Sequence, residues 1–314
     1  MVYTMKRKIK GKEYNYMRKS IRLPDGKIKV IELIIKDKNK EKYKELLEKK
    51  EKKVLIGFAL KNYEHDVVFS EEEIKKIEEM RLNYKKILKK LNKEQIKDLF
   101  DRFTANFTYE SNAIEGNSLT LKDVAIVMFE NRSIEGKNLR EIYETINSRK
   151  VVESIIRKKF DISHEDIIKM HSLLMKDIDT RRNYKKVPNI ILGSKLKLVP
   201  PEKVHEKMSE LINFYKKNVK KIHPVKLSAL FHGKFEQIHP FEDGNGRVGR
   251  FLSVLILIKN NYFPLIIRSS QRDSYIKTLE DFDNGYNTNL ERFFLEKFKD
   301  TYRDFFEMYL RYLN

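Results

Sequence analysis

The stretch Ile238–Phe251, IHPFEDGNGRVGRF, gathers three of the chain's 11 glycines within six positions, beside a histidine, two acids and two arginines. It runs into an apolar stretch, FLSVLILI, whose spacing predicts a helix buried on several sides. The first turn of a helix carries unpaired backbone N–H groups and a partial positive charge. Glycine lets an anion approach the backbone closely, so Gly244 and Gly246 predict a site for phosphate oxygens at this helix end.

The charged side chains around these glycines extend the prediction. Arg247 and Arg250 are three positions apart, so on a helix they lie on one face, where two guanidinium groups suit a polyphosphate. Asp243 is a single carboxylate at the mouth of the turn, and Mg²⁺ bound to phosphates takes one or two protein carboxylates. A positive helix end favours neutral His239, as a general base at about pH 7 requires. Each feature alone is common in structural roles, but together they indicate phosphoryl or nucleotidyl transfer.

The segment His239–Arg250 resembles the signature of the Fic family, His-Pro-Phe-x-Asp/Glu-Gly-Asn-Gly-Arg-x-x-Arg, at every fixed position. The upstream residues His232, Phe235 and Ile238 are also typical of the family, and the resemblance covers roughly residues 95–290. It implies a mainly α Fic fold, a helical bundle with an embedded β-hairpin flap. It also implies a protein adenylyltransferase, which transfers AMP from ATP to a Ser, Thr or Tyr hydroxyl of a protein. The sequence contains no P-loop and no Rossmann motif.

The same resemblance gives each motif residue a role. His239 is the catalytic base, and Asp243 is the Mg²⁺ ligand. The residues that it assigns to nucleotide binding are Gly244, Asn245, Gly246, Arg247, Arg250 and Tyr275. Tyr275 falls in a region that lines the adenine base in relatives, with ordinary core packing as the alternative. Glycine rather than lysine at position 246 favours adenylyl transfer over phosphorylation. Removal of AMP, or transfer of another nucleotide or phosphate-containing group, stays open as an alternative for the same fold.

A second motif lies upstream, in Ser111-Asn112-Ala113-Ile114-Glu115-Gly116. Glu115 lies at the end of a predicted helix that Gly116 stops, where the helix dipole disfavours a carboxylate. A solvated glutamate is one reading, and a cationic partner across the fold is the other. The segment resembles the inhibitory motif of Fic proteins with an N-terminal inhibitory helix. That resemblance implies that Ser111, Glu115 and Gly116 are inhibitory and that Glu115 pairs with Arg250, which blocks the productive position of the γ-phosphate.

The segment 187–200, VPNIILGSKLKLVP, has β-branched residues on either side of Gly193-Ser194 and predicts a short hairpin. By resemblance it is the family's flap, which holds a segment of the target protein by strand addition. An ordinary hairpin over the core is the alternative. The predicted contacts are Val187, Pro188, Asn189, Ile190, Ile191 and Leu192.

The rest of the chain is organised around this helical domain. Residues 1–69 form a predicted N-terminal α/β region, with a hairpin around Leu23-Pro24-Asp25-Gly26. Residues 70–314 form the predicted Fic domain, with the inhibitory helix at about 93–116 and the core at about 120–290. The apolar run Val54–Leu60 fits either a strand or a helix.

The chain carries a net charge of +20, mostly from lysine interspersed with glutamate. Such charge suits either a solvated surface or a polyanionic partner, and it says nothing about fold. The absence of cysteine excludes disulfides. With no apolar run long enough to span a membrane and no secretory leader pattern, we expect a cytoplasmic protein without a membrane partner.

The expected partners are ATP and a protein target that the sequence does not name, which can be the chain itself. A nucleic-acid-binding regulator is the alternative of a different class, suggested by the net charge of +20. We do not favour it, because the N-terminal region lacks an aromatic–basic RNA signature and no winged helix follows the core. The C-terminal helix is dense in Phe, Tyr and Leu, which leaves a homodimer open.

Overall fold

The computed structural model describes residues 2–189 and 198–313. The chain divides into two compact units, Met1–Leu82 and Asn83–Asn314, and we describe each by itself. The division falls inside helix α2 (Glu71–Lys90), beyond the boundary at residue 69 that the sequence predicts. None of the helices in the described part of the chain is long and apolar enough to cross a membrane.

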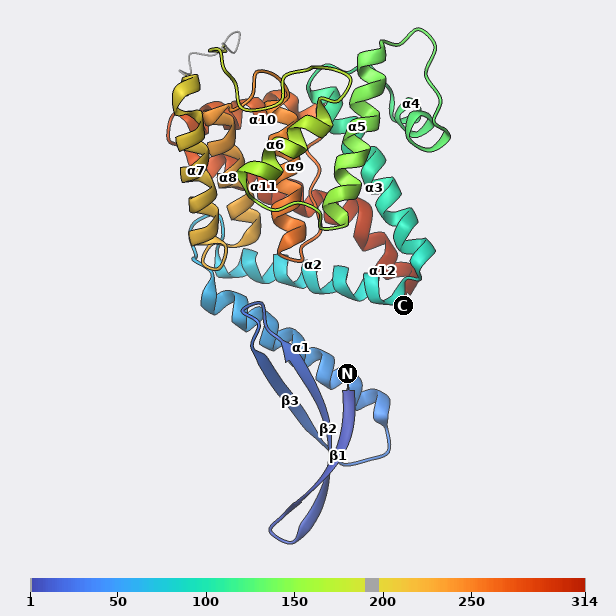
Figure 1. Cartoon of the computed structure of the whole chain (residues 1–314). Coiled ribbons are helices and arrows are strands. Elements are labelled where there is room, and N and C mark those ends of the chain that lie inside the picture. The colour runs from blue at the N-terminus through green and yellow to red at the C-terminus, as the bar shows by residue number, and fades with distance from the viewer. Residues whose placement is uncertain (1, 190–197, 314) are drawn as a thin grey trace. The chain divides into compact units, whose positions relative to one another are not determined.

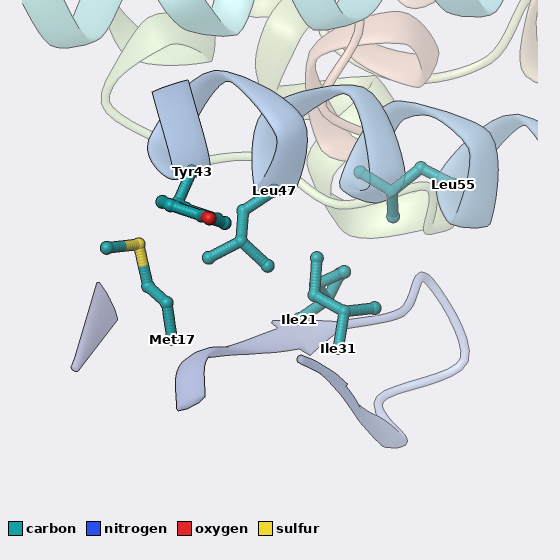
Figure 2. Packing of buried hydrophobic residues seen from close by; sticks show 6 residues of the cluster. All are labelled: Met17, Ile21, Ile31, Tyr43, Leu47 and Leu55. Carbon is teal, nitrogen blue, oxygen red and sulfur yellow. The ribbon is translucent and has the colours of Figure 1, made fainter. Parts of the chain in front are cut away.

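The first unit is a three-stranded antiparallel sheet with one helix packed on it (Figure 1). Strands β1 (Val2–Ile9), β2 (Lys12–Arg22) and β3 (Ile28–Ile35) lie in sequence order, and α1 (Lys40–Asn62) follows. The turn at Leu23–Lys27 joins β2 to β3, with Gly26 at φ 89°. Figure 2 shows the core of this unit, in which side chains from β2, β3 and α1 meet; they are Met17, Ile21, Ile31, Tyr43, Leu47 and Leu55.

Two parts of this unit differ from the sequence reading. The apolar run Val54–Leu60, open between strand and helix, lies inside α1, and Leu55 and Ala59 are buried there. Strand β1 is absent from the prediction, because its residues are exposed or half-buried along its length and show no apolar alternation. Its pairing with β2 creates a strand that its own sequence pattern does not signal.

The second unit is helical. Its helices are α3 (Lys93–Ile114), α4 (Leu121–Ala125), η1 (Ile126–Glu130), α5 (Leu139–Ile156), α6 (His164–Leu174), α7 (Pro201–Asn218), α8 (Pro224–Ile238), α9 (Asn245–Lys259), η2 (Ser269–Gln271), α10 (Arg272–Asp283), α11 (Asn287–Thr301), η3 (Tyr302–Glu307) and α12 (Met308–Leu313). Side chains fix several starts: Asn92 with Gln95 forms a capping box at α3, and Asn138 with Glu141 forms one at α5. The mainly α fold class predicted from the sequence is confirmed.

Helix α9 is the central element of this unit. Every residue from Arg247 to Leu257 is buried, and α3, α5, α6 and α8 contact the helix (Figure 1). A helix buried on several sides agrees with the apolar run after the glycines. Its N-terminal turn therefore lies where residues from four other helices can reach it.

The predicted flap lies mostly outside the described residues, since Ile190, Ile191 and Leu192 fall within 190–197. The described residues on either side, 187–189 and 198–200, form no strand. The hairpin therefore stays a prediction.

Candidate active site

The site is built on the turn between α8 and α9. His239 ends α8 in the left-handed region at φ 49°, and Gly244 starts α9 at φ 81°. Asn245 fixes the turn between them, because its side chain accepts a hydrogen bond from the Phe241 N–H at 2.8 Å and donates one to the Phe241 carbonyl at 2.7 Å. Phe241 is fully buried and stacks on His171 with ring centroids 3.8 Å apart. The turn is thus held by its own polar side chain and by one aromatic anchor.

His239 is mostly buried, with 18% of its side chain exposed. Burial lowers its pKa to about 4, with the positive charge of Lys185 acting in the same direction. Its Nδ1 lies 3.9 Å from a carboxylate oxygen of Glu236. That contact is not an ion pair at neutral pH, because burial also raises the pKa of Glu236 to about 8. His239 is therefore a neutral imidazole, able to accept a proton.

Glu236 belongs to a buried polar cluster that the sequence reading did not identify. A Cβ on Gly249 would lie 2.5 Å from Glu236 Oε1 and 2.8 Å from His232 Nδ1. Glycine at this position therefore leaves room for both groups. The other ring nitrogen of His232 lies 2.6 Å from the Tyr275 hydroxyl. The sequence analysis named His232 and Tyr275 separately. The signal for a group packed against α9 is Gly249, which lies within a helix where alanine would be the more stable residue.

Arg250 lies one turn into α9 and is almost fully buried. Its Nε donates to the Ser111 hydroxyl at 3.0 Å, and its Nη2 donates to the Ser111 carbonyl at 2.8 Å and to Glu115 Oε1 at 2.7 Å. Burial alone would lower the pKa of Arg250, but the charge of Glu115 raises it above its ordinary value. The structure thus joins the two segments that the sequence analysis singled out separately.

Glu115 is the C-cap residue of α3, and Gly116 follows it at φ 96°. The Glu115 carboxylate lies so close to Gly246 that a side chain at position 246 would collide with Glu115 Oε1. The carboxylate is 40% exposed and stands at the first turn of α9. This is the helix end that favours anions, so a protein carboxylate occupies the position predicted for phosphate oxygens.

Asp243 and Arg247 lie at the other side of the turn. Asp243 is 39% exposed and accepts a hydrogen bond from Arg140 Nη2 at 2.7 Å. Burial would raise the pKa of Asp243, but Arg140 and Arg247 lower it below its ordinary value. The Arg247 guanidinium is buried and lies 3.2 Å from Glu144. Sequence reasoning missed Arg140 and Glu144, because only packing brings α5 beside the turn.

The segment that leads into the predicted flap is tied to the same turn. The Lys185 N–H donates to the Pro240 carbonyl at 2.8 Å, and Asn189 Nδ2 donates to the Phe241 carbonyl at 2.8 Å. The Lys185 amine donates to Asn189 Oδ1, also at 2.8 Å, and burial lowers its pKa. Asn189 thus has a structural contact beside its predicted role.

Three further predicted residues differ in exposure. Val187 and its neighbour Pro188 are exposed, as a surface that meets another chain requires. Tyr275 is instead fully buried, and burial raises the pKa of its hydroxyl. Its contacts are those of a core residue, and its adenine contact remains a prediction.

Within residues 2–189 and 198–313, no group of three or more His, Cys, Asp or Glu side chains could hold a metal ion. Asp243 offers a half-exposed, ionised carboxylate at the turn. One carboxylate suffices for Mg²⁺ when phosphates supply other ligands, so these residues fit a magnesium ion that arrives with a nucleotide.

Residues 161–257 match the model of the Fic/DOC family. A probable protein adenylyltransferase of Aquifex aeolicus is 32% identical, over 60% of this chain and 58% of the relative. The protein adenylyltransferase Fic of Nematostella vectensis is 31% identical, over 56% of this chain and 43% of the relative. The chain therefore spans about half the length of these two curated relatives, and less of others.

Solved structures agree on the fold. A Fic family protein from Desulfovibrio desulfuricans superposes with a TM-score of 0.59 at 27% identity, over 73% of each chain. A Fic domain containing signaling protein from Bacteroides thetaiotaomicron gives a TM-score of 0.66 at 24% identity, over 72% of this chain and 95% of that one. The matched segment contains α8, the turn and most of α9, where every position of the signature is filled. Residues 161–257 are therefore similar to a Fic/DOC domain, and the fold agrees with that of solved Fic proteins.

Proposed function

We propose that this chain is a protein adenylyltransferase that moves AMP from ATP to a protein hydroxyl and is held inactive by Glu115. The observation that carries the proposal is the place of the Glu115 carboxylate, against Gly246 and 2.7 Å from Arg250. A negative group at a glycine-lined helix end, paired with a buried guanidinium, mimics a phosphate. The contact therefore supports both parts of the proposal: the helix end binds phosphate, and Glu115 takes the place of that phosphate in the inactive state.

His239 acts as the general base. As a neutral imidazole it accepts the proton of the acceptor Ser, Thr or Tyr hydroxyl. The freed oxygen attacks the α-phosphorus of ATP, a new P–O bond forms, and the bond to the β-phosphate oxygen breaks. Pyrophosphate leaves, and the AMP remains on the target.

The turn and α9 bind the phosphates. Backbone N–H groups at Gly244–Gly246 and the side chains of Arg247 and Arg250 offset charge on the leaving pyrophosphate. Asp243 would hold a magnesium ion, which supplies charge neutralisation to the phosphates when bound. Such an ion would compete with Arg140 for this carboxylate, since the two side chains are paired at 2.7 Å.

Autoinhibition follows from competition for one guanidinium. While Arg250 is held by Glu115 and by Ser111, it cannot hold an outer phosphate of ATP in the same position.

The target chain would lie beside Val187–Asn189, which leads from the surface to the turn through Asn189 and Lys185. In this proposal the target is another protein or a second copy of the chain.

The test compares Glu115→Gly with the unaltered protein, each incubated with cell lysate and with Mg·ATP carrying a label on the α-phosphate. We expect labelled protein in Glu115→Gly, and mass spectrometry should find AMP on a hydroxyl side chain. Glu135→Gly, at an exposed glutamate outside the site, is the matched control and should behave as the unaltered chain. Labelling that survives in Glu115→Gly/His239→Ala would contradict the base, and no labelling in Glu115→Gly would contradict the inhibition.

A further inference from the structure

The N-terminal sheet ends in a two-stranded projection. β3 pairs with β2 only over Asn15–Arg22, whereas β1 and β2 stay paired as far as Ile9 and Lys12. Residues 7–14 therefore extend past the third strand by about 10 Å, and we call them the basic arm. Figure 1 shows this hairpin continuing beyond the end of β3. Lys10 and Gly11 at its tip have φ of 46° and 79°, values of a two-residue turn whose twist matches the strands.

The arm is strongly positive. Its charged residues comprise one acid, Glu13, and four basic residues, Arg7, Lys8, Lys10 and Lys12, all of them exposed. The acid is engaged by Lys6 at 2.6 Å. The surrounding segment has the same character, because residues 1–38 contain twelve Lys or Arg against four Asp or Glu. Residues 1–38 thus carry a net charge of +8, out of +20 for the whole chain.

The sheet face that joins the arm is apolar and exposed. α1 covers the face that carries Met17 and Ile31, and the register places the other alternating residues on the opposite face. Its exposed large side chains are Tyr3, Ile9, Ile28, Val30 and Ile34. We call these residues the outer face. Arg18 stands among them, 3.0 Å from Glu32. Several exposed apolar side chains on one sheet face, next to concentrated positive charge, are typical of a binding surface.

We propose that the basic arm and the outer face bind duplex DNA. The major groove of B-form DNA admits a two-stranded β-ribbon, whereas the deep, narrow major groove of RNA does not admit protein side chains. The lysines of the arm suit the phosphates on either side of the groove. The apolar side chains can contact thymine methyl groups. The sequence analysis did not favour nucleic acid because this region lacks an aromatic–basic RNA signature; the strand register shows instead that its basic residues lie on one projecting hairpin.

The test uses the full chain and a fluorescently labelled duplex of about 20 base pairs, two helical turns, in anisotropy titrations. The dissociation constant is measured between about 50 and about 200 mM salt. The arm variant is Lys8→Ala/Lys10→Ala/Lys12→Ala. The matched control, Lys216→Ala/Lys217→Ala/Lys220→Ala, removes the same charge from exposed residues at the end of α7. A third variant exchanges the three arm lysines for arginine.

We expect the arm variant to bind at least about tenfold more weakly and to reduce the salt slope by about three, one per lost phosphate contact. The control should stay within about threefold of the unaltered chain, and the arginine variant should retain binding. Equal weakening by the arm variant and the control would overturn the proposal, since the effect would then belong to net charge. It would also be overturned by absent binding, or by double-stranded RNA or an acidic polypeptide that binds as tightly as DNA. Adenylyl transfer plays no part in these measurements, so the two proposals stand or fall separately.

Discussion

Glu115 Oε1 lies 2.7 Å from Nη2 of Arg250, a residue 135 positions away in the sequence. The contact depends on where α3 ends, and two further contacts hold that end. Glu110 accepts hydrogen bonds from the Ser269 N–H at 2.6 Å and from its hydroxyl at 2.7 Å, and Arg272 Nε donates to the Ile114 carbonyl at 2.9 Å. The Glu115 carboxylate is therefore positioned from the segment that begins α10, outside the turn that we propose to bind phosphate. A perturbation of that segment tests the proposed inhibition without touching a group that would bind ATP.

Arg272→Ala should activate the enzyme partially. Arg272 satisfies a carbonyl in the last turn of α3, and loss of such a bond costs about 1 kcal/mol, which corresponds to roughly fivefold in an equilibrium. We expect AMP incorporation to rise about that much, and by less than in Glu115→Gly. Arg132→Ala, at another exposed arginine, is the control. Identical labelling in Arg272→Ala and Arg132→Ala would show that this anchor does not set the inhibited state.

The pH dependence of catalysis tests the state of His239. A base must be unprotonated, and burial together with Lys185 lowers the pKa of His239 to about 4. In Glu115→Gly, kcat/KM should therefore stay level on acidification and fall only below about pH 5, because this ratio reports groups of the free enzyme. Lys185→Ala removes the second cause, so its acid limb should shift upward. An acid limb near the ordinary histidine value of about 6.5 in Glu115→Gly would contradict a desolvated base.

The helices and the turn before α9 were predictable because their signals are local. Capping residues mark the start of α3, apolar periodicity marks α9, and the glycines mark the turn at which Arg247 and Arg250 stand. Phosphate binding at this turn stays a prediction. The family resemblance predicted the pairing of Glu115 with Arg250. Local chemistry alone left two alternatives for Glu115, a solvated side chain or a cationic partner. Arg140 and Lys185 could not be found in this way. Their contacts with Asp243 and Pro240 join elements that are close only in the folded chain, and nothing in their own neighbourhoods signals them.

Stability should respond to pH through Glu236. Burial raises its pKa to about 8 from an ordinary value near 4.5, so the folded state holds a proton that the unfolded state has released. Between these values the free energy of unfolding falls as pH rises. Glu236→Gln removes that dependence. The free energy of unfolding of this variant, relative to that of the unaltered chain, should therefore be on the order of 1–3 kcal/mol higher at about pH 8 than at about pH 5, as measured by denaturant unfolding. Glu153→Gln, at a partly exposed glutamate of α5, should show no such gain. A pH-independent difference between Glu236→Gln and the unaltered chain would refute the buried, protonated carboxyl.

Gly249→Ala should destabilise the protein through the same cluster. The added Cβ would lie 2.5 Å from Glu236 Oε1 and 2.8 Å from His232 Nδ1, and overpacking of a tight core costs about 1–3 kcal/mol. Gly57→Ala in α1 is the matched control. Nothing lies within 4 Å of a Cβ added at position 57, so the Gly57→Ala protein should be more stable than the unaltered chain by about 0.5–1 kcal/mol through helix propensity. Shortening the carboxyl side chain in Gly249→Ala/Glu236→Ala should recover part of the loss, because the closest of the two contacts is removed. If Gly249→Ala proved as stable as Gly57→Ala in urea unfolding, the close approach of Glu236 and His232 to α9 would be wrong.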